Sequence, residues 1–258
     1  MNWNIYLQGL YVMLAFAFAG WLISLYRRNV THVDSMWSLF FVLAAIAYAN
    51  KMDALTDRSL IVLLLVGIWA TRLCLYLTWR NWGTHEDHRY AEIRQNNAPY
   101  FGLKSLYIVF VLQALLAWVI SLSILGAIIS AKTMNIVDIA GIFLVSFGLI
   151  WETVADWQLS IFKANPDNNG KVLDSGVWRY SRHPNYFGEC CIWWGFFLIA
   201  LAAGAWWALP SALLMTFLLL KFSGVALLEK DIDTRRPAYA AYIQSTNALI
   251  PGCKRAQK

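Results

Sequence analysis

Charged residues are scarce in this sequence. Only 14% of the 258 residues are Asp, Glu, Lys or Arg, whereas about a quarter of the residues of an ordinary soluble domain are charged. Hydrophobic residues make up 59% of the chain, and apolar stretches recur from end to end. This balance excludes an ordinary soluble domain. It predicts an all-α, polytopic integral membrane protein, because helices satisfy their own backbone groups inside a bilayer.

Signatures of soluble nucleotide-binding and metal-binding proteins are also missing. There is no Walker loop and no Gly-x-Gly-x-x-Gly after a strand, so a soluble dinucleotide-binding fold is not supported. The four cysteines lack metal-ligand spacing, and we expect them to pack between helices without forming disulfides. The contiguous residues 85–88, His-Glu-Asp-His, would point to different faces of a short helix, so no metal site is predicted.

Seven apolar stretches are long enough to be candidate transmembrane helices. The first is not a cleavable signal, because it lacks a basic start and ends at Arg27-Arg28 without a small-residue cleavage site. Hydropathy places the spans at 6–26, 33–50, 60–80, 106–130, 138–160, 188–203 and 206–228.

Basic residues are concentrated in the loops on one side of this seven-helix arrangement. That side receives ten basic residues and the basic C-terminal tail, whereas the other side receives only Lys51, Arg58 and Lys132. The positive-inside rule therefore predicts an N-terminus outside and a C-terminus in the cytosol. We expect a multi-pass protein of a bacterial inner membrane whose site faces the cytoplasm.

The most informative segment is 174–189, a polar and aromatic run between two apolar stretches. Pro184 disfavours helix at His183 and marks a helix start just after it. We expect free backbone N–H groups there which, with Arg179, Arg182 and His183, form an anion site suited to phosphates. Three aromatic residues of the run can stack on a flat ring: Trp178, Tyr180 and Tyr186. A membrane-interface belt would also explain Trp178 and Tyr180.

Ionisable residues inside predicted spans are costly and often functional. Glu152, Asp156 and Lys163 share one face of their helix, and Glu189 lies within a turn of Asn185. These carboxylates either form internal salt bridges or line a polar cavity, where they can accept hydrogen bonds from ribose hydroxyls or a carboxamide. Lys163 can then meet a phosphate.

Two further segments are expected on the cytosolic face. In the loop 81–104, Arg89 and Arg94 are predicted to cap the site and touch the ligand or the tail. The tail, from Glu229 through Tyr239 and Tyr242, is amphipathic and is predicted to fold back and close the site.

Together these residues resemble the DUF1295 branch of the steroid 5-alpha-reductase superfamily. The resemblance covers nearly the whole chain and rests on several motifs: Val33-Asp34-Ser35-Met36-Trp37, Arg72-Leu73, Arg89-Tyr90-x-x-Ile93-Arg94, Glu152-x-x-x-Asp156-x-Gln158, Gly176-Val-Trp-Arg-Tyr180-x-Arg182-His-Pro-Asn-Tyr-Phe-Gly-Glu189, and Glu229 with Arg236-x-x-Tyr239.

The resemblance implies seven membrane helices in one domain, 1–258, with substrate-side helices in 1–105 and an NADPH-binding half in 106–258. It implies a flat hydrophobic enone that enters from the bilayer. No nucleic-acid partner is expected, because the net charge of +6 follows from basic residues concentrated in the loops of one side. The expected cofactor-binding residues, taken from the motifs and from the charge pattern, are Glu152, Asp156, Lys163, Trp178, Tyr180, Arg182, His183, Asn185, Glu189, Glu229, Arg236 and Tyr239.

The expected reaction is hydride transfer from the nicotinamide to a conjugated C=C bond, with an acid hydrogen-bonded to the carbonyl. Asp34, if buried and protonated, or Tyr76 is the candidate acid. Two alternatives stay open. The Arg-His-Pro-Asn-Tyr-Phe-Gly core is also similar to isoprenylcysteine carboxyl methyltransferases, which bind S-adenosylmethionine, and a non-enzymatic lipid-binding protein is the third possibility.

Overall fold

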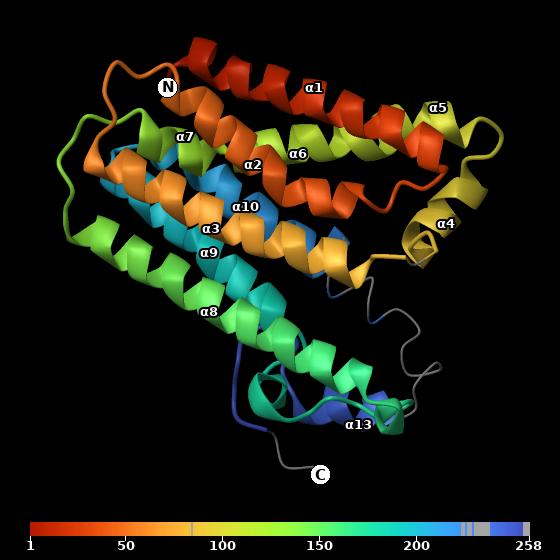
Figure 1. The fold of residues 1–258 in the computed structure, drawn as a ribbon. Helices are drawn as coiled ribbons and strands as arrows, with labels where there is room; N and C mark the ends of the chain where they lie inside the picture. The colour runs from red at the N-terminus through yellow and green to blue at the C-terminus, as the bar shows by residue number, and fades with distance from the viewer. Residues whose placement is uncertain (84, 223–224, 226–228, 230–237, 255–258) are drawn as a thin grey trace. The chain divides into compact units, whose positions relative to one another are not determined.

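We describe the protein from a computed structural model, which covers all residues except 84, 223–224, 226–228, 230–237 and 255–258. The described residues are helical wherever they are regular, with no strand among them, and they confirm the predicted all-α membrane class (Figure 1). Within the described part of the chain, five helices are long and apolar enough to cross a bilayer: Trp3–Arg27, Asp57–Arg80, Phe101–Ile120, Ile136–Ala164 and Pro184–Ala202. Two shorter apolar helices are Val33–Ala49 and Trp206–Phe222.

The chain divides into two compact units. Unit 1 comprises Met1–Asn135 and Ala200–Pro210, and unit 2 comprises Ile136–Ile199 and Ser211–Lys258. Each unit is described by itself. The orientation of the chain across a membrane stays a prediction from the loop charges.

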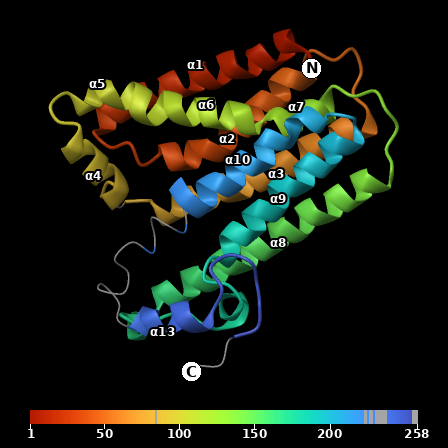
Figure 2. The same ribbon diagram turned by 180° about the vertical axis from the view of Figure 1, so that it is seen from behind.

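Unit 1 is built around helix α2 (Val33–Ala49), which lies between α1 (Trp3–Arg27) and α3 (Asp57–Arg80) (Figure 1). Viewed from behind, α6 (Leu112–Ile120) and α7 (Leu122–Ile128) pack across α2 (Figure 2). The connection to α6 runs through α4 (His88–Asn96), α5 (Phe101–Ser105) and the π-helical segment η1 (Leu106–Val111).

The predicted span 106–130 differs from the structure at both ends. The helical stretch begins earlier, at Phe101, and a turn at Ser121 separates α6 from α7. The Ser121 hydroxyl lies 2.7 Å from the Trp118 carbonyl and 2.7 Å from the Tyr48 hydroxyl. A serine that bonds back to a carbonyl of its own helix competes with the helical ladder, and here the contact with Tyr48 accompanies that competition at the break.

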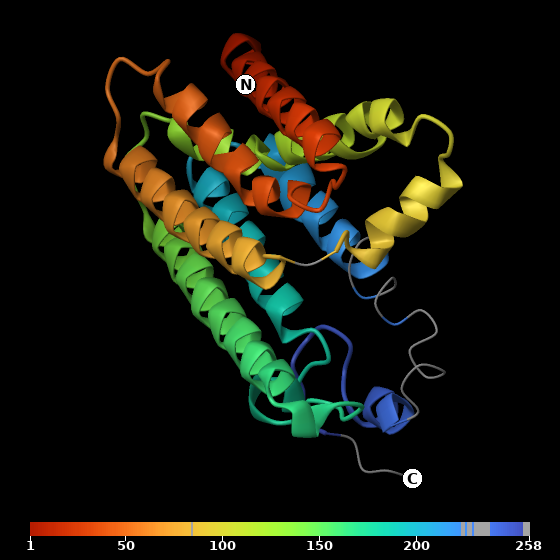
Figure 3. The same cartoon turned by 45° about the vertical axis from the view of Figure 1, so that its right-hand side comes forward.

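Unit 2 is organised by the pair α8 (Ile136–Ala164) and α9 (Pro184–Ala202), which run side by side (Figure 3). Glycines on both helices allow a close backbone approach. A Cβ atom added to Gly148 would lie 2.5 Å from the Gly188 carbonyl, and one added to Gly141 would lie 2.8 Å from the Gly195 carbonyl. Because any larger residue would push the helices apart, these glycines set the spacing of the pair.

The rest of unit 2 consists of short elements. Two 3-10 turns, η2 (Pro166–Asn168) and η3 (Gly176–Arg179), connect α8 to α9, and α13 (Ala238–Ser245) follows near the C-terminus. The last apolar stretch comprises η4 (Trp206–Ala208), α10 (Leu209–Phe217) and the π-helical η5 (Leu218–Phe222). Its η4 and the first two residues of α10 belong to unit 1, and the rest of the stretch belongs to unit 2.

Candidate functional site

The polar run 174–189 is anchored to α8 by its own motif residues. Gln158 on α8 accepts a hydrogen bond from the Val177 N–H at 3.1 Å. Gly176 has a positive φ of 59°, and a Cβ atom there would lie 2.4 Å from the Gln158 Oε1 atom, so this position requires glycine. The buried Trp178 donates from Nε1 to the Ala155 carbonyl at 3.1 Å. The indole is therefore packed against α8; the sequence had left open either stacking on a ligand ring or a membrane-interface belt for this residue.

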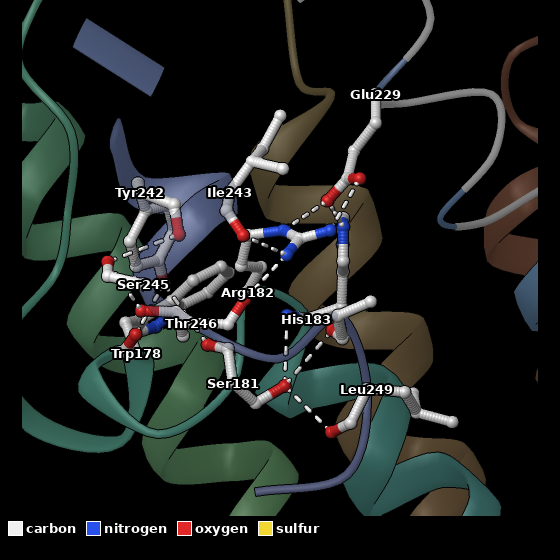
Figure 4. Close-up of polar contacts among 11 residues, drawn as sticks. Trp178, Ser181, Arg182, His183, Glu229, Tyr242, Ile243, Ser245, Thr246 and Leu249 are labelled. Atoms are coloured by element: carbon white, nitrogen blue, oxygen red, sulfur yellow. Dashed lines mark hydrogen bonds and ion pairs between the residues drawn. The ribbon is translucent and has the colours of Figure 1, made fainter. Parts of the chain in front are cut away.

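The C-terminal segment lies along the same run, as predicted from its amphipathic pattern. The Arg182 and His183 N–H groups donate to the carbonyls of Asn247 and Ala248 at 2.9 and 3.1 Å. The Ser181 hydroxyl donates to the Leu249 carbonyl at 2.8 Å. The Tyr242 hydroxyl donates to the Trp178 and Ser181 carbonyls (Figure 4). The tail is therefore docked through its main-chain carbonyls and through the Tyr242 hydroxyl.

Arg182 is engaged with protein groups at all three guanidinium nitrogens (Figure 4). Its Nε and Nη2 atoms donate to the two carboxylate oxygens of Glu229 at 2.7 and 2.8 Å. Its Nη1 atom donates to the carbonyls of Thr246 and Ile243 at 2.5 and 3.2 Å. The charge of Arg182 is therefore matched by Glu229 within the fold. The sequence had led us to expect that Arg182 binds a phosphate of the ligand.

His183 completes this cluster, with its Nε2 atom 2.9 Å from the Glu229 carboxylate. The His183 and Tyr186 rings are parallel to within 4°, with centroids 5.5 Å apart. Burial raises the pKa of Glu229, but hydrogen bonds from His183 and Arg182 outweigh burial and lower the pKa to about 2. We call Arg182, His183 and Glu229 the tail cluster.

Helix α9 begins at Pro184, which confirms the predicted helix start. One of the backbone groups expected to be free is in use, because the Phe187 N–H donates to the His183 carbonyl at 3.1 Å. This is the ordinary first bond of an α-helix, and only the N–H groups before it lack a helical partner.

Next to this helix start, α8 and α9 bring together the carboxylates predicted to line a cavity. Asn185 donates to Asp156 at 3.3 Å, and Trp193 donates to Glu189 at 3.0 Å. A Cβ atom on Gly188 would lie 2.8 Å from the Glu152 Cβ atom, so this glycine brings α9 against Glu152. The residues that carry these carboxylates are buried, with only 4–5% of their surface exposed: Glu152, Asp156 and Glu189.

The other cations and aromatic residues of the predicted site lie at the surface of unit 2. Arg179, at the end of η3, and Lys163, in the last turn of α8, are exposed. Tyr180 is exposed as well, and its carbonyl accepts from the Gly252 N–H at 3.0 Å. Tyr239 packs edge-on against Tyr242, with centroids 5.3 Å apart. Arg236 lies outside the described residues.

Asp34, the first candidate acid, belongs to a cluster in unit 1. Its two carboxylate oxygens accept from Arg89 Nη2 at 2.8 Å and from the Tyr90 hydroxyl at 2.5 Å. Gln113 donates to the same hydroxyl at 3.2 Å. Both carboxylate oxygens of Asp34 therefore accept hydrogen bonds from protein donors, whereas the candidate acid was expected to donate one.

Arg94 extends this cluster, and we name Asp34, Glu86, Arg89, Tyr90 and Arg94 the loop cluster. Arg94 pairs with Glu86 at 2.7 Å, and Glu86 also accepts from the Val30 N–H at 3.0 Å. Burial raises the pKa of Glu86, but these hydrogen bonds outweigh burial and lower it.

These contacts tie α4 to the turn between α1 and α2. The Arg89 and Arg94 side chains therefore contact their own unit, although we had expected them to cap the ligand or the tail. Tyr76, the second candidate acid, is half-buried on α3, with the Arg80 guanidinium carbon 5.9 Å from its ring centre.

Sequence reasoning missed the residues whose main-chain carbonyls hold Arg182, namely Ile243 and Thr246. Backbone acceptors leave no mark in side-chain chemistry, so no motif could have indicated them. It also missed Ser181, whose only signal was its place inside the Arg-Tyr-Ser-Arg-His-Pro run.

Comparisons with known proteins agree with the resemblance on family alone. The model of a family described as "Protein of unknown function (DUF1295)" matches residues 20–246. An uncharacterized protein of Schizosaccharomyces pombe, C594.04c, is 23% identical over 285 residues, which cover 97% of this chain and 80% of that protein. No solved structure is significantly similar to the chain.

Proposed function

Because the chain belongs to the DUF1295 family of membrane proteins, we propose that it is a membrane reductase that uses NADPH to reduce a conjugated C=C bond of a hydrophobic, lipid-like enone. The proposal draws on the motif resemblance to the steroid 5-alpha-reductase superfamily. The observation that carries it is the polar end of the α8–α9 pair, where buried carboxylates gather beside Asn185 in helices apolar enough to cross a membrane.

The hydrogen-bonding groups at this end fit the sugar and amide parts of a dinucleotide. Glu152, Asp156 and Glu189 accept hydrogen bonds, as ribose hydroxyls and a carboxamide require. Asn185 donates to Asp156 and keeps one amide hydrogen and its carbonyl oxygen for further bonds. A ligand that carries hydroxyls would replace water at these groups without leaving buried acceptors unpaired.

The phosphate part needs cations that are exposed at the surface. Arg182 is paired with Glu229, so we propose Arg179 as the main phosphate contact, with Lys163 as a second. Among the described residues, Arg179 has no hydrogen-bond or ion-pair partner, and its exposed guanidinium can bind a phosphate with two parallel N–H bonds.

When bound, NADPH would supply the hydride for the reduction. The chain would supply acceptors that orient the nicotinamide riboside and a proton donor for the substrate carbonyl. Of the two acids expected from the sequence, we keep Tyr76 as the proposed donor, because Asp34 is held as an acceptor by Arg89 and Tyr90.

The test is ligand binding by the detergent-solubilised, full-length protein. Thermal shift and calorimetry with NADPH are expected to show stabilisation, and S-adenosylmethionine is expected to have no effect. Arg179→Ala and Asn185→Ala should each weaken NADPH binding roughly tenfold, the value of one charge-assisted or buried hydrogen bond. Lys254→Ala is the matched control, since Lys254 is a cation of the same unit that pairs with Asp174 at the surface.

Stabilisation by S-adenosylmethionine and not by NADPH would replace the reductase with a methyltransferase. A parent protein that responds to neither ligand would favour a non-enzymatic, lipid-binding role, with the carboxylates bracing the helix pair. Equal NADPH affinity of the parent and of both site variants would remove this end of α8–α9 from the site.

A further inference from the structure

His183 is buried, with 4% of its surface exposed, yet only one of its ring nitrogens has a partner among the described residues. That partner is Glu229, whose carboxylate can only accept. The Nε2 atom therefore carries the proton in this contact. In a neutral imidazole the other nitrogen, Nδ1, is then an acceptor.

The ring has little freedom to turn. The Tyr186 ring lies parallel to it, and the His183 N–H donates to the Ala248 carbonyl at 3.1 Å and to the Ser181 hydroxyl at 3.1 Å. Pro184 follows directly, which restricts the backbone of His183 to extended conformations. The direction of Nδ1 is thus set by the fold.

Glu229 is held in turn by Arg182. The guanidinium binds both carboxylate oxygens, and its remaining nitrogen binds the Thr246 and Ile243 carbonyls of the docked tail (Figure 4). A two-point contact of this kind fixes the plane of the carboxylate. Glu229 is therefore presented to His183 in one orientation.

We propose that Glu229 is a positioning residue that holds His183 with its proton on Nε2, so that Nδ1 accepts a hydrogen bond from a hydroxyl or amide N–H of the bound ligand. The proposal deepens the proposed function, on which the identity of the ligand rests: a ribose hydroxyl or the carboxamide of NADPH has this donor chemistry. It assigns different roles to residues that the sequence placed together as cofactor contacts. His183 touches the ligand, and Glu229 and Arg182 act through it.

Two substitutions of His183 distinguish the roles of its two ring nitrogens. The terminal amide of glutamine reaches the position of Nε2, so His183→Gln keeps a donor for Glu229 and loses the acceptor at Nδ1. The shorter asparagine places its amide near Nδ1, so His183→Asn keeps an acceptor and loses the contact with Glu229. His88→Gln is the matched control, because the His88 side chain is 78% exposed and lies in unit 1.

NADPH binding to the full chain is the first readout. We expect His183→Gln to weaken binding roughly tenfold, the effect of one lost hydrogen bond, and His183→Asn to weaken it less. The opposite order, with normal binding by His183→Gln and loss with His183→Asn, would show that His183 serves only the contact with Glu229 and would overturn the proposal.

The second readout does not depend on NADPH. The chain has four histidines, so nitrogen-15 labelling of histidine gives a simple spectrum in which His183→Gln identifies one resonance. A ring N–H bonded to a buried carboxylate exchanges slowly with water. We expect this proton on Nε2 in the parent, its retention with a changed shift in Glu229→Gln, and its loss in Glu229→Leu.

A parent spectrum without a protected Nε2 proton would overturn the positioning role of Glu229. A parent that shows this proton but fails to bind NADPH would overturn the proposed function and leave the Glu229–His183 contact standing. The two failures are therefore distinguishable.

Discussion

Each unit of the molecule contains a cluster in which an arginine pairs with a carboxylate beside an aromatic ring, and the two clusters differ in how fully their groups are used. In the loop cluster the Tyr90 hydroxyl donates to Asp34 and accepts from Gln113, so its hydrogen-bonding capacity is occupied. In the tail cluster His183 has a partner at Nε2 only, among the described residues. A satisfied cluster braces the fold, whereas a buried group with unused hydrogen-bonding capacity needs an explanation, for which we propose a ligand contact.

The contacts around each cluster support the same distinction between a bracing cluster and a cluster beside the proposed ligand site. Arg94 and Glu86 tie the loop cluster to the turn after α1, through the Val30 N–H and the Arg28 carbonyl. The tail cluster lies at the start of α9, next to Asn185 and its contact with Asp156 on α8. We therefore expect changes in the loop cluster to affect stability, and changes in the tail cluster to affect both stability and ligand binding.

The largest effect is expected from Arg182→Ala. This change leaves the Glu229 carboxylate half-buried without its main partner and removes two bonds to the tail, at a cost of about 3 kcal/mol in stability. Hydrogen exchange of residues 243–252 should become faster, and NADPH binding should be lost with the docked tail.

Arg179→Ala is the control for Arg182→Ala, because Arg179 is an exposed arginine three residues earlier on the same run. It should weaken NADPH binding without changing exchange in the tail. Normal exchange in Arg182→Ala would mean that the tail is held by its backbone bonds alone.

Lowering the pH should gradually weaken the contacts of Glu229 with Arg182 and His183. The pKa of Glu229 is about 2 in the folded protein, below its ordinary value of 4.5, because its bonds to His183 and Arg182 outweigh burial. The stabilisation is therefore fully present above about pH 4.5 and is lost as the pH falls toward 2. Hydrogen exchange of the tail across this range measures it, and Glu229→Gln should remove the dependence. A tail that stays protected at pH 2 in the parent would contradict this assignment.

Gly176→Ala should destabilise the run that carries the tail cluster by about 2 kcal/mol, because a left-handed backbone and the contact with Gln158 both oppose a side chain. Gly170→Ala is a matched control in the same unit. Gly170 also has a positive φ, of 78°, but no atom lies within 4 Å of an added Cβ, so about 1 kcal/mol is expected. Equal thermal shifts for the two variants would exclude the Gln158 contact as a cause.

The smallest effect is expected in the loop cluster. Tyr90→Phe removes one hydrogen bond to the Asp34 carboxylate and should lower stability by about 1.5 kcal/mol, while NADPH affinity stays at the parent value. Thermal unfolding and calorimetry on the same sample measure both. A loss of NADPH affinity at unchanged stability would make the loop cluster part of the ligand site and erase the contrast between the two units.

Hydropathy and local chain chemistry were enough to predict the fold class and most of the helices. Long apolar stretches form helices in a bilayer whatever their neighbours are, and Pro184 starts α9 through its own geometry. The break at Ser121 was not predictable in the same way, because it involves the Tyr48 hydroxyl from another helix.

What the sequence by itself determined is the membrane class, the helix start at Pro184 and the gathering of polar motif residues near it. Only the tertiary structure decided what those residues do. Arg182, His183 and Glu229 looked alike as ligand contacts, and 46 or 47 positions of chain separate Glu229 from the other two. The choice between a protein partner and a ligand depends on which distant groups the fold brings within hydrogen-bond distance, and no local pattern encodes that choice.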